Sequence, residues 1–157
     1  MRDATSDSLP GSLPSSTATI AGHPIHPIFA PFPIACFTGA LVTDLVYWRT
    51  ADMMWETFSI WLITAGIVTG VLAGIAGAID FLGNRRIRAL SPGWPHALGN
   101  TIALILSFIN AFVHSRDGYT SVVPEGLILS ALVVVILAFT GWMGWSMVYR
   151  HGVGVVQ

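Results

Sequence analysis

Four long stretches of the chain contain no charged side chain. They run from Ser8 to Thr43, from Thr57 to Ile79, from Ala89 to Ser115 and from Gly126 to Tyr149. A helix of about 20 apolar residues crosses the roughly 30 Å hydrocarbon core of a bilayer, so this pattern predicts four membrane-spanning helices. We place the predicted spans at about residues 28–48, 58–82, 95–114 and 125–149.

The predicted architecture is all-α: a polytopic membrane protein with a four-transmembrane-helix bundle over residues 22–157. Residues 1–21 are rich in Ser, Thr and Pro and lack an apolar stretch of signal-peptide length, so we expect a flexible N-terminal tail. The composition agrees, because only 10% of the residues are charged, against about 25% in an ordinary soluble domain. Four spans and their connections use nearly all of the chain, so we expect no soluble catalytic domain.

The start of the first span is unusual because it contains four prolines, namely Pro24, Pro27, Pro31 and Pro33. Proline removes a backbone donor and clashes with the preceding helical turn. We therefore expect an extended or kinked segment that becomes a regular helix near Ile34.

The arginines predict an orientation in the membrane. The side of the two termini carries Arg2, Arg85, Arg86, Arg88 and Arg150. The opposite side carries only Arg49 and Arg116. The positive-inside rule therefore predicts that both termini lie in the cytoplasm. The net charge of −1 and the absence of Lys argue against a nucleic-acid partner, which would need a basic stripe.

Four of the five histidines fall at the predicted cytoplasmic boundary. They are His23 and His26 at the first span, His96 at the third and His151 after the fourth. Asp80, Asn84 and Asn100 belong to the same layer, whereas His114 lies at the opposite boundary. Imidazole is the commonest protein ligand for metal ions and a frequent ligand of haem iron, so this layer is the predicted functional site.

Small residues accompany these histidines. At about 100° per residue, His151 shares a helix face with Gly144 and Gly141, and Gly77 precedes Asp80 on a face of the second span. Such cleared strips suit a flat cofactor, and they equally suit tight helix packing. In the second span, a further row predicts a face for a partner helix or a second copy of the chain, formed by Gly66, Gly70 and Gly74.

The leading functional hypothesis is a small electron-transfer module that binds b-type haem through two histidines, without a covalent attachment motif. His96 and His151 form the first predicted pair, with His26 third and His23 fourth. The residues expected to border the haem are Gly77, Gly141, Gly144 and Asn100. A divalent metal ion is the variant hypothesis, and its predicted ligands are His26, His96, His151 and Asp80.

The competing hypothesis is a cofactor-free structural or accessory subunit of a larger inner-membrane complex. Its histidines would bond loop backbone, and its glycine-rich face would dock a partner helix. A channel or transporter is less supported, since only Asp44 and His114 are candidate ionisable groups within the spans. The sequence has no catalytic triad, phosphate loop or metalloprotease spacing, so we do not expect an enzyme by itself. The single thiol, Cys36, is expected to pack in the core.

One spacing occurs in both the first and the third span. Eighteen residues separate His26 from Asp44, and eighteen separate His96 from His114, which is five helical turns or a rise of about 27 Å. Each of these parallel spans would carry an imidazole at one boundary and an ionisable group near the other, as two tandem hairpins would. Asp44 either lies shallow and pairs with Arg49 at the interface or faces the bundle, where His114 is a second candidate partner.

Three segments resemble the bacterial membrane-protein family known as domain of unknown function 2231. They are HPIHPIFAPFPIACFTGALVTDLVY, IAGAIDFLGNRRIRALSPGWPHALGN and GWMGWSMVYRHGVGV. The resemblance covers about residues 22–155 and implies a four-helix protein of the bacterial inner membrane, with no settled activity. Some similar proteins are joined to iron-sulfur or cytochrome-type domains, which implies a redox protein as a partner.

Overall fold

The structure is a computed structural model that describes residues 13–116 and 122–154. Its elements, in chain order, are β1 (Thr19–Ile20), β2 (His23–Pro24), α1 (Ile25–Phe29), α2 (Pro31–Thr50), α3 (Met53–Gly83), α4 (Arg85–Ala89), α5 (Gly93–His114), the short turn η2 (Val122–Gly126) and α6 (Leu127–Tyr149).

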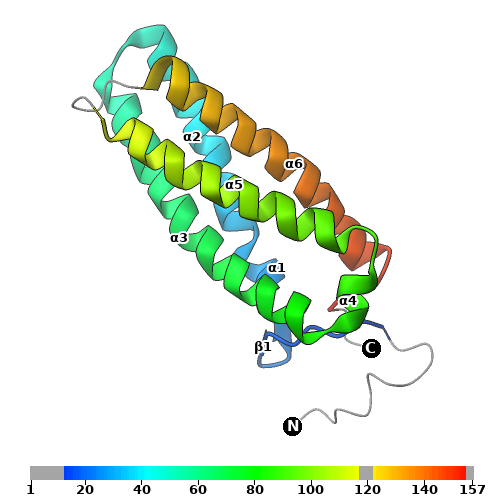
Figure 1. Cartoon of the computed structure of the whole chain (residues 1–157). Coiled ribbons are helices and arrows are strands. Elements are labelled where there is room, and N and C mark those ends of the chain that lie inside the picture. The colour runs from blue at the N-terminus through cyan, green and yellow to red at the C-terminus, as the bar shows by residue number, and fades with distance from the viewer. Residues whose placement is uncertain (1–12, 117–121, 155–157) are drawn as a thin grey trace.

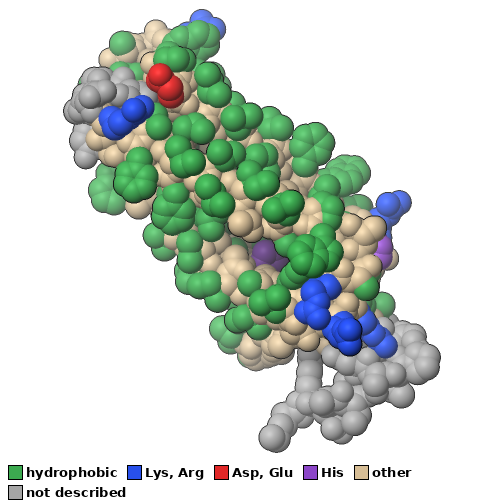
Figure 2. Space-filling model, in the orientation of Figure 1, with side chains coloured by type: hydrophobic (Ala, Val, Ile, Leu, Met, Phe, Trp, Pro, Cys, Tyr) green, Lys and Arg blue, Asp and Glu red, His purple; other side chains and the backbone are tan. Residues whose placement is uncertain are grey.

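Within the described ranges, four helical segments are long and apolar enough to cross a membrane, which confirms the number of predicted spans. They are Ile25–Thr50, Met53–Gly83, Gly93–His114 and Val122–Tyr149. Figure 1 shows them as an elongated bundle in which α2 and α5 run one way and α3 and α6 return. Hydrophobic side chains cover the length of the bundle, and charged side chains gather near its two ends (Figure 2).

The two ends of the bundle differ in what they contain. The strand pair, α4 and the described residues after α6 lie at one end, called here the terminal end, and the α2–α3 turn and η2 lie at the distal end (Figure 1). Helix α2 packs against α3 and α6, and α5 also packs against α3 and α6, so α2 and α5 lie diagonally across the bundle. The side of the membrane that each end faces stays a prediction.

The proline-rich start of the first span is helical earlier than predicted. Helix α1 begins at Ile25, and a break at Ala30 separates it from α2, so the kink is confirmed but an extended segment up to Ile34 is wrong. The first N–H groups of a helix have no intrahelical acceptor. Each proline stands where no donor is lost: Pro24 is the N-cap of α1, Pro27 is its third residue, and Pro31 and Pro33 lie in the first turn of α2.

Residues 13–21 are held against the bundle, although the sequence predicted a flexible tail there. Ser16 and Ala18 are buried, and the carboxylate of Asp80 near the end of α3 accepts hydrogen bonds from this segment. Ser16 Oγ donates at 2.8 Å, the backbone N–H of Thr17 at 2.6 Å and that of Ala18 at 2.7 Å. The prediction of a flexible tail is therefore wrong for residues 13–21, and its earlier part, residues 1–12, lies outside the described residues.

The glycine row of α3 serves packing within one chain. A Cβ at Gly66 would lie 2.6 Å from the Phe37 ring of α2, and one at Gly70 would lie 3.3 Å from Leu104 of α5. Of the three, only Gly74 would place a Cβ in open space. The predicted Gly66/Gly70/Gly74 face for a second copy is therefore wrong as a row, because two of its members already contact neighbouring helices.

Candidate functional site

Two histidines from different spans meet at the terminal end. His26 lies on α1 and His96 on the first turn of α5, and their ring centroids are 5.9 Å apart with an angle of 84° between the ring planes. Both side chains are half-buried. The space-filling view shows a histidine at the bottom of a hollow toward this end of the bundle (Figure 2). This pair is the best assembled group in the predicted histidine layer.

Each of the two imidazoles is anchored to the backbone of another helix. His26 Nδ1 lies 2.8 Å from the carbonyl oxygen of Ala73 on α3, and His96 Nδ1 lies 2.8 Å from that of Thr140 on α6. A carbonyl oxygen only accepts, so Nδ1 is the donor in both rings. In the neutral form of each ring, Nε2 then carries the free lone pair. This is the arrangement by which proteins orient histidines that bind metal through Nε2.

A glycine makes room for each ring. A Cβ at Gly77 would lie 2.9 Å from His26 Nδ1, and a Cβ at Gly144 would lie 3.1 Å from His96 Cε1. Both positions were predicted to border a cofactor, but in the structure they border the imidazoles. The strip predicted beside His151 is thus occupied by His96, and a Cβ at Gly141 would meet open space.

The anchoring is repeated between the two halves of the bundle. His96 follows His26 by 70 residues, while Thr140 and Gly144 follow Ala73 and Gly77 by 67 each. In each half, a histidine on the first helix bonds a carbonyl on the second and rests on the glycine four residues later. The two hairpins are therefore structurally equivalent here, and the two rings meet where the hairpins meet.

The side-chain amide of Asn100 contacts Nε2 of His96, the ring nitrogen that is not bonded to Thr140. Its Nδ2 lies 3.2 Å from His96 Nε2 and donates to the His96 carbonyl oxygen at 2.8 Å, while its Oδ1 accepts from Thr140 Oγ1 at 3.0 Å. An amide N–H facing Nε2 requires an unprotonated nitrogen there, in agreement with donation from Nδ1. Asn100, a predicted cofactor neighbour, thus favours the tautomer of His96 that carries its proton on Nδ1.

The other predicted ligands lie apart from this pair. His151 follows the end of α6, and its Nδ1 bonds the carbonyl oxygen of Ser146 in that helix at 3.1 Å. His23 is exposed in β2, and the carboxylate of Asp80 accepts its hydrogen bonds from residues 16–18. Within residues 13–116 and 122–154, no three His, Cys, Asp or Glu side chains form a group that could hold a metal ion. The predicted four-ligand set of His26, His96, His151 and Asp80 is therefore not assembled.

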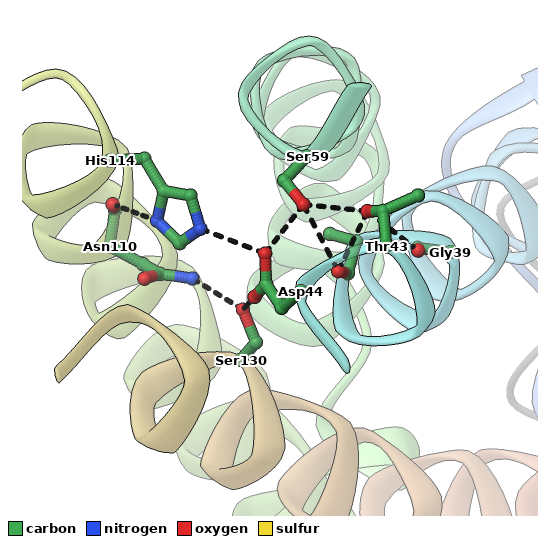
Figure 3. A network of polar contacts seen from close by, with 8 residues as sticks. Gly39, Thr43, Asp44, Ser59, Asn110, His114 and Ser130 are labelled. Carbon is green, nitrogen blue, oxygen red and sulfur yellow. Dashed lines mark hydrogen bonds and ion pairs between the residues drawn. The ribbon is translucent and has the colours of Figure 1, made fainter. Parts of the chain in front are cut away.

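A second polar site lies at the distal end, inside the bundle. Asp44 of α2 is fully buried, and its carboxylate contacts three other helices (Figure 3). Ser59 Oγ of α3 and Ser130 Oγ of α6 each donate at 2.5 Å, and His114 Nε2 of α5 lies 3.0 Å away. Of the two interpretations of Asp44, the structure supports the one in which it faces the bundle with His114 as partner. Arg49 is exposed, 5.3 Å from the Trp48 ring centre.

The contacts of His114 determine how many protons the Asp44–His114 pair holds. His114 Nδ1 lies 3.0 Å from the carbonyl oxygen of Asn110 and must donate to it. The contact between Nε2 and Asp44 Oδ1 then needs one more proton, on the imidazole or on the carboxyl group. Either placement leaves the pair neutral overall, which suits a site with 0% exposure of both side chains.

Sequence reasoning missed Glu56, Ser59 and Ser130 as members of this distal site. Glu56 and Ser59 are one turn apart on α3 and have 0% exposure, and Ser130 is 3% exposed. The spacing of 70 residues from Asp44 to His114, the same as from His26 to His96, identifies the two pairs but not these three residues. Each half contributes one member to each of the two pairs.

Comparison with protein-family models matches residues 22–157 to a family described as a predicted membrane protein, DUF2231. Searches of the curated proteins and of the solved structures found no match. The family description names no ligand or reaction.

Proposed function

This chain belongs to the DUF2231 family of predicted membrane proteins, and we propose that it is a membrane-embedded redox module in which His26 and His96 ligate one b-type haem iron. The observation that carries the proposal is the 5.9 Å separation of the two ring centroids. Two imidazoles need roughly this separation to place one ring nitrogen each about 2 Å from a shared ion.

The number of protein ligands favours haem over a bare metal ion. A structural or catalytic zinc site uses at least three protein ligands, and no such group exists among the described residues. Haem iron brings four nitrogens of its own and needs only axial ligands from the protein. A pair of histidines would therefore supply both axial ligands of a haem, whereas a divalent ion would need further protein ligands.

The protein's own contribution would be orientation and tuning of the two ligands. The carbonyl oxygens of Ala73 and Thr140 fix the planes of the rings and increase the basicity of Nε2 by accepting from Nδ1. Asn100 would have to turn away from His96 Nε2 for ligation. When bound, haem supplies one-electron chemistry, and the partner would be another redox protein in or at the membrane.

The test is an absorption spectrum of the full-length protein, purified in detergent from cells supplied with a haem precursor. We expect a Soret band with sharp reduced alpha and beta bands, lost in both His26→Ala and His96→Ala. His151→Ala is the matched control, because the described contact of the His151 ring is with a backbone carbonyl oxygen of the adjoining helix α6. That variant should keep the spectrum.

Two outcomes would contradict the proposal. A colourless protein that also lacks metal would leave the rings as packing elements and favour an accessory subunit. A spectrum lost in His151→Ala but kept in His26→Ala would restore the pair first predicted from the sequence.

A further inference from the structure

The distal site contains a buried carboxylate that its own neighbours do not neutralise. Glu56 has 0% exposure, and neither of its side-chain oxygens has a hydrogen-bond partner. It interacts electrostatically with Asp44 and His114. Because those two groups form a pair that is neutral overall, they offer Glu56 no uncompensated positive charge. An ionised carboxylate in this position is costly unless something else neutralises it.

The surroundings of Glu56 contain no other buried cation among the described residues. Asp44 and His114 are the ionisable groups that face it from α2 and α5, and α6 contributes none, since Leu127–Tyr149 has no Asp, Glu, Lys, Arg or His. Among the residues that the structure describes, the charged side chains near this end are exposed, namely Arg49, Asp52, Arg116 and Glu125. Neutralisation of Glu56 must therefore come from outside the described protein atoms.

The buried side-chain atoms that lack a hydrogen-bond partner in the described structure are all acceptors. They are the two carboxylate oxygens of Glu56 and Oδ1 of Asn110, whose residue is only 2% exposed. Asn110 belongs to the same network, because its Nδ2 donates to Ser130 Oγ, which donates to Asp44. A set of buried acceptors without donors fits a missing proton or a small cation, since both are held by oxygen.

A surface hollow lies next to the buried side chain of Glu56. A hollow of about 420 Å³ on α3 is lined by Glu56, Thr57, Ile60, Trp61 and Thr64. Helix α3 has 31 residues, or about 46 Å at 1.5 Å per residue, which exceeds the roughly 30 Å hydrocarbon core. Glu56 lies in the first turn of α3, so the hollow lies near the membrane surface, where water is available.

From these observations, we propose that Glu56, beside the Asp44–His114 pair, is an exchangeable binding site for one small monovalent cation, either a proton or a sodium ion. The pair does not compete for the cation, because the proton that its hydrogen bond requires already lies between Nε2 and Oδ1. The hydroxyls of Ser59 and Ser130 are already donated to Asp44, which leaves Glu56 as the free acceptor. This proposal is independent of haem binding at the other end.

The experiment is infrared difference spectroscopy of the full-length protein in proteoliposomes. One arm changes the pH at constant salt, and the other replaces N-methylglucamine by Na⁺ at constant ionic strength and alkaline pH. For a proton site, we expect one carboxylic-acid C=O band that disappears as the pH rises and shifts in D₂O. For a sodium site, we expect a carboxylate band that shifts with Na⁺. Either response should be lost in Glu56→Gln.

Glu125→Gln is the matched control, since Glu125 is an exposed carboxylate near the same end, and it should retain the response. As a measurement that needs no variant, a pH-indicator dye should report one more proton bound per wild-type chain at acid pH than the histidines and the other carboxyl groups account for, or one Na⁺ should bind per chain. A difference spectrum that is the same in wild type and Glu56→Gln overturns the proposal. So does a wild-type protein in which neither ion changes any buried carboxyl band.

Discussion

Two glycines three residues apart on α3 give a sharp test of the His26 anchor. A Cβ at Gly77 would lie 2.9 Å from His26 Nδ1, whereas a Cβ at Gly74 would contact nothing within 4 Å. Gly77→Ala and Gly74→Ala gain the same helix propensity, so this term cancels in their difference. What remains is the interaction of the new methyl group with the imidazole.

The expected loss of stability has two parts, the overpacking of the His26 ring and the loss of its hydrogen bond. Overpacking costs about 1–3 kcal/mol, and loss of the bond from Nδ1 to the Ala73 carbonyl oxygen adds about 0.5–1.5 kcal/mol. We therefore expect Gly77→Ala to be less stable than Gly74→Ala by roughly 2–4 kcal/mol, or about 30- to 1,000-fold in the unfolding equilibrium constant.

The assay is reversible unfolding in mixed detergent micelles, followed by tryptophan fluorescence and circular dichroism. Gly74→Ala should match or slightly exceed the wild type in stability. Equal stability of the two variants would refute the close fit between Gly77 and His26. On α6, Gly144→Ala against Gly141→Ala repeats the comparison for His96, with a smaller difference because the contact is 3.1 Å.

Two further predictions concern the polar contacts at the two ends. Asp44→Ala should destabilise the protein by about 3–5 kcal/mol, because it leaves His114 and two hydroxyls buried without their acceptor. Asp44→Asn keeps one acceptor oxygen and should destabilise the protein clearly less in the same unfolding assay. Equal losses of stability in the two variants would contradict this explanation. Asp80→Ala should release residues 13–18, seen as faster proteolysis within that segment at unchanged helix content. A cleavage rate equal to that of the wild type would show that Asp80 does not hold the segment.

The fold was largely predictable because membrane spans depend on a one-dimensional property. The lack of charge over about 20 residues is sufficient to identify a span, and the four predicted spans agree with the helices to within a few residues at most ends. The local exceptions have local causes. The prolines are tolerated because two helix starts follow each other, and residues 13–21 are ordered because Asp80 accepts three donors from them.

The site was harder to predict because it depends on which helices are neighbours. Rotation by about 100° per residue placed His151 over Gly144, but α6 ends at Tyr149, so the rotation no longer applies at His151. His26 and His96 meet because α1 and α5 approach each other at the terminal end, which no single-helix pattern reveals. The spacing of eighteen residues in two spans was the stronger signal, since it placed both members of both pairs at matching depths.

The sharing of each polar pair between the two hairpins bears on how the chain enters the membrane. Asp44 and Glu56 are synthesised before His114. Among the described residues of the first hairpin, only Ser59 donates a side-chain hydrogen bond to Asp44, so this carboxylate lacks its other partners until the second hairpin is made. An isolated charge of this kind costs about 2.5–3.5 kcal/mol on insertion scales. The second hairpin removes that cost when it brings His114 and Ser130 to Asp44. Membrane insertion and tertiary assembly are thus coupled, because the first hairpin becomes fully stable in the bilayer only after the second hairpin has packed against it.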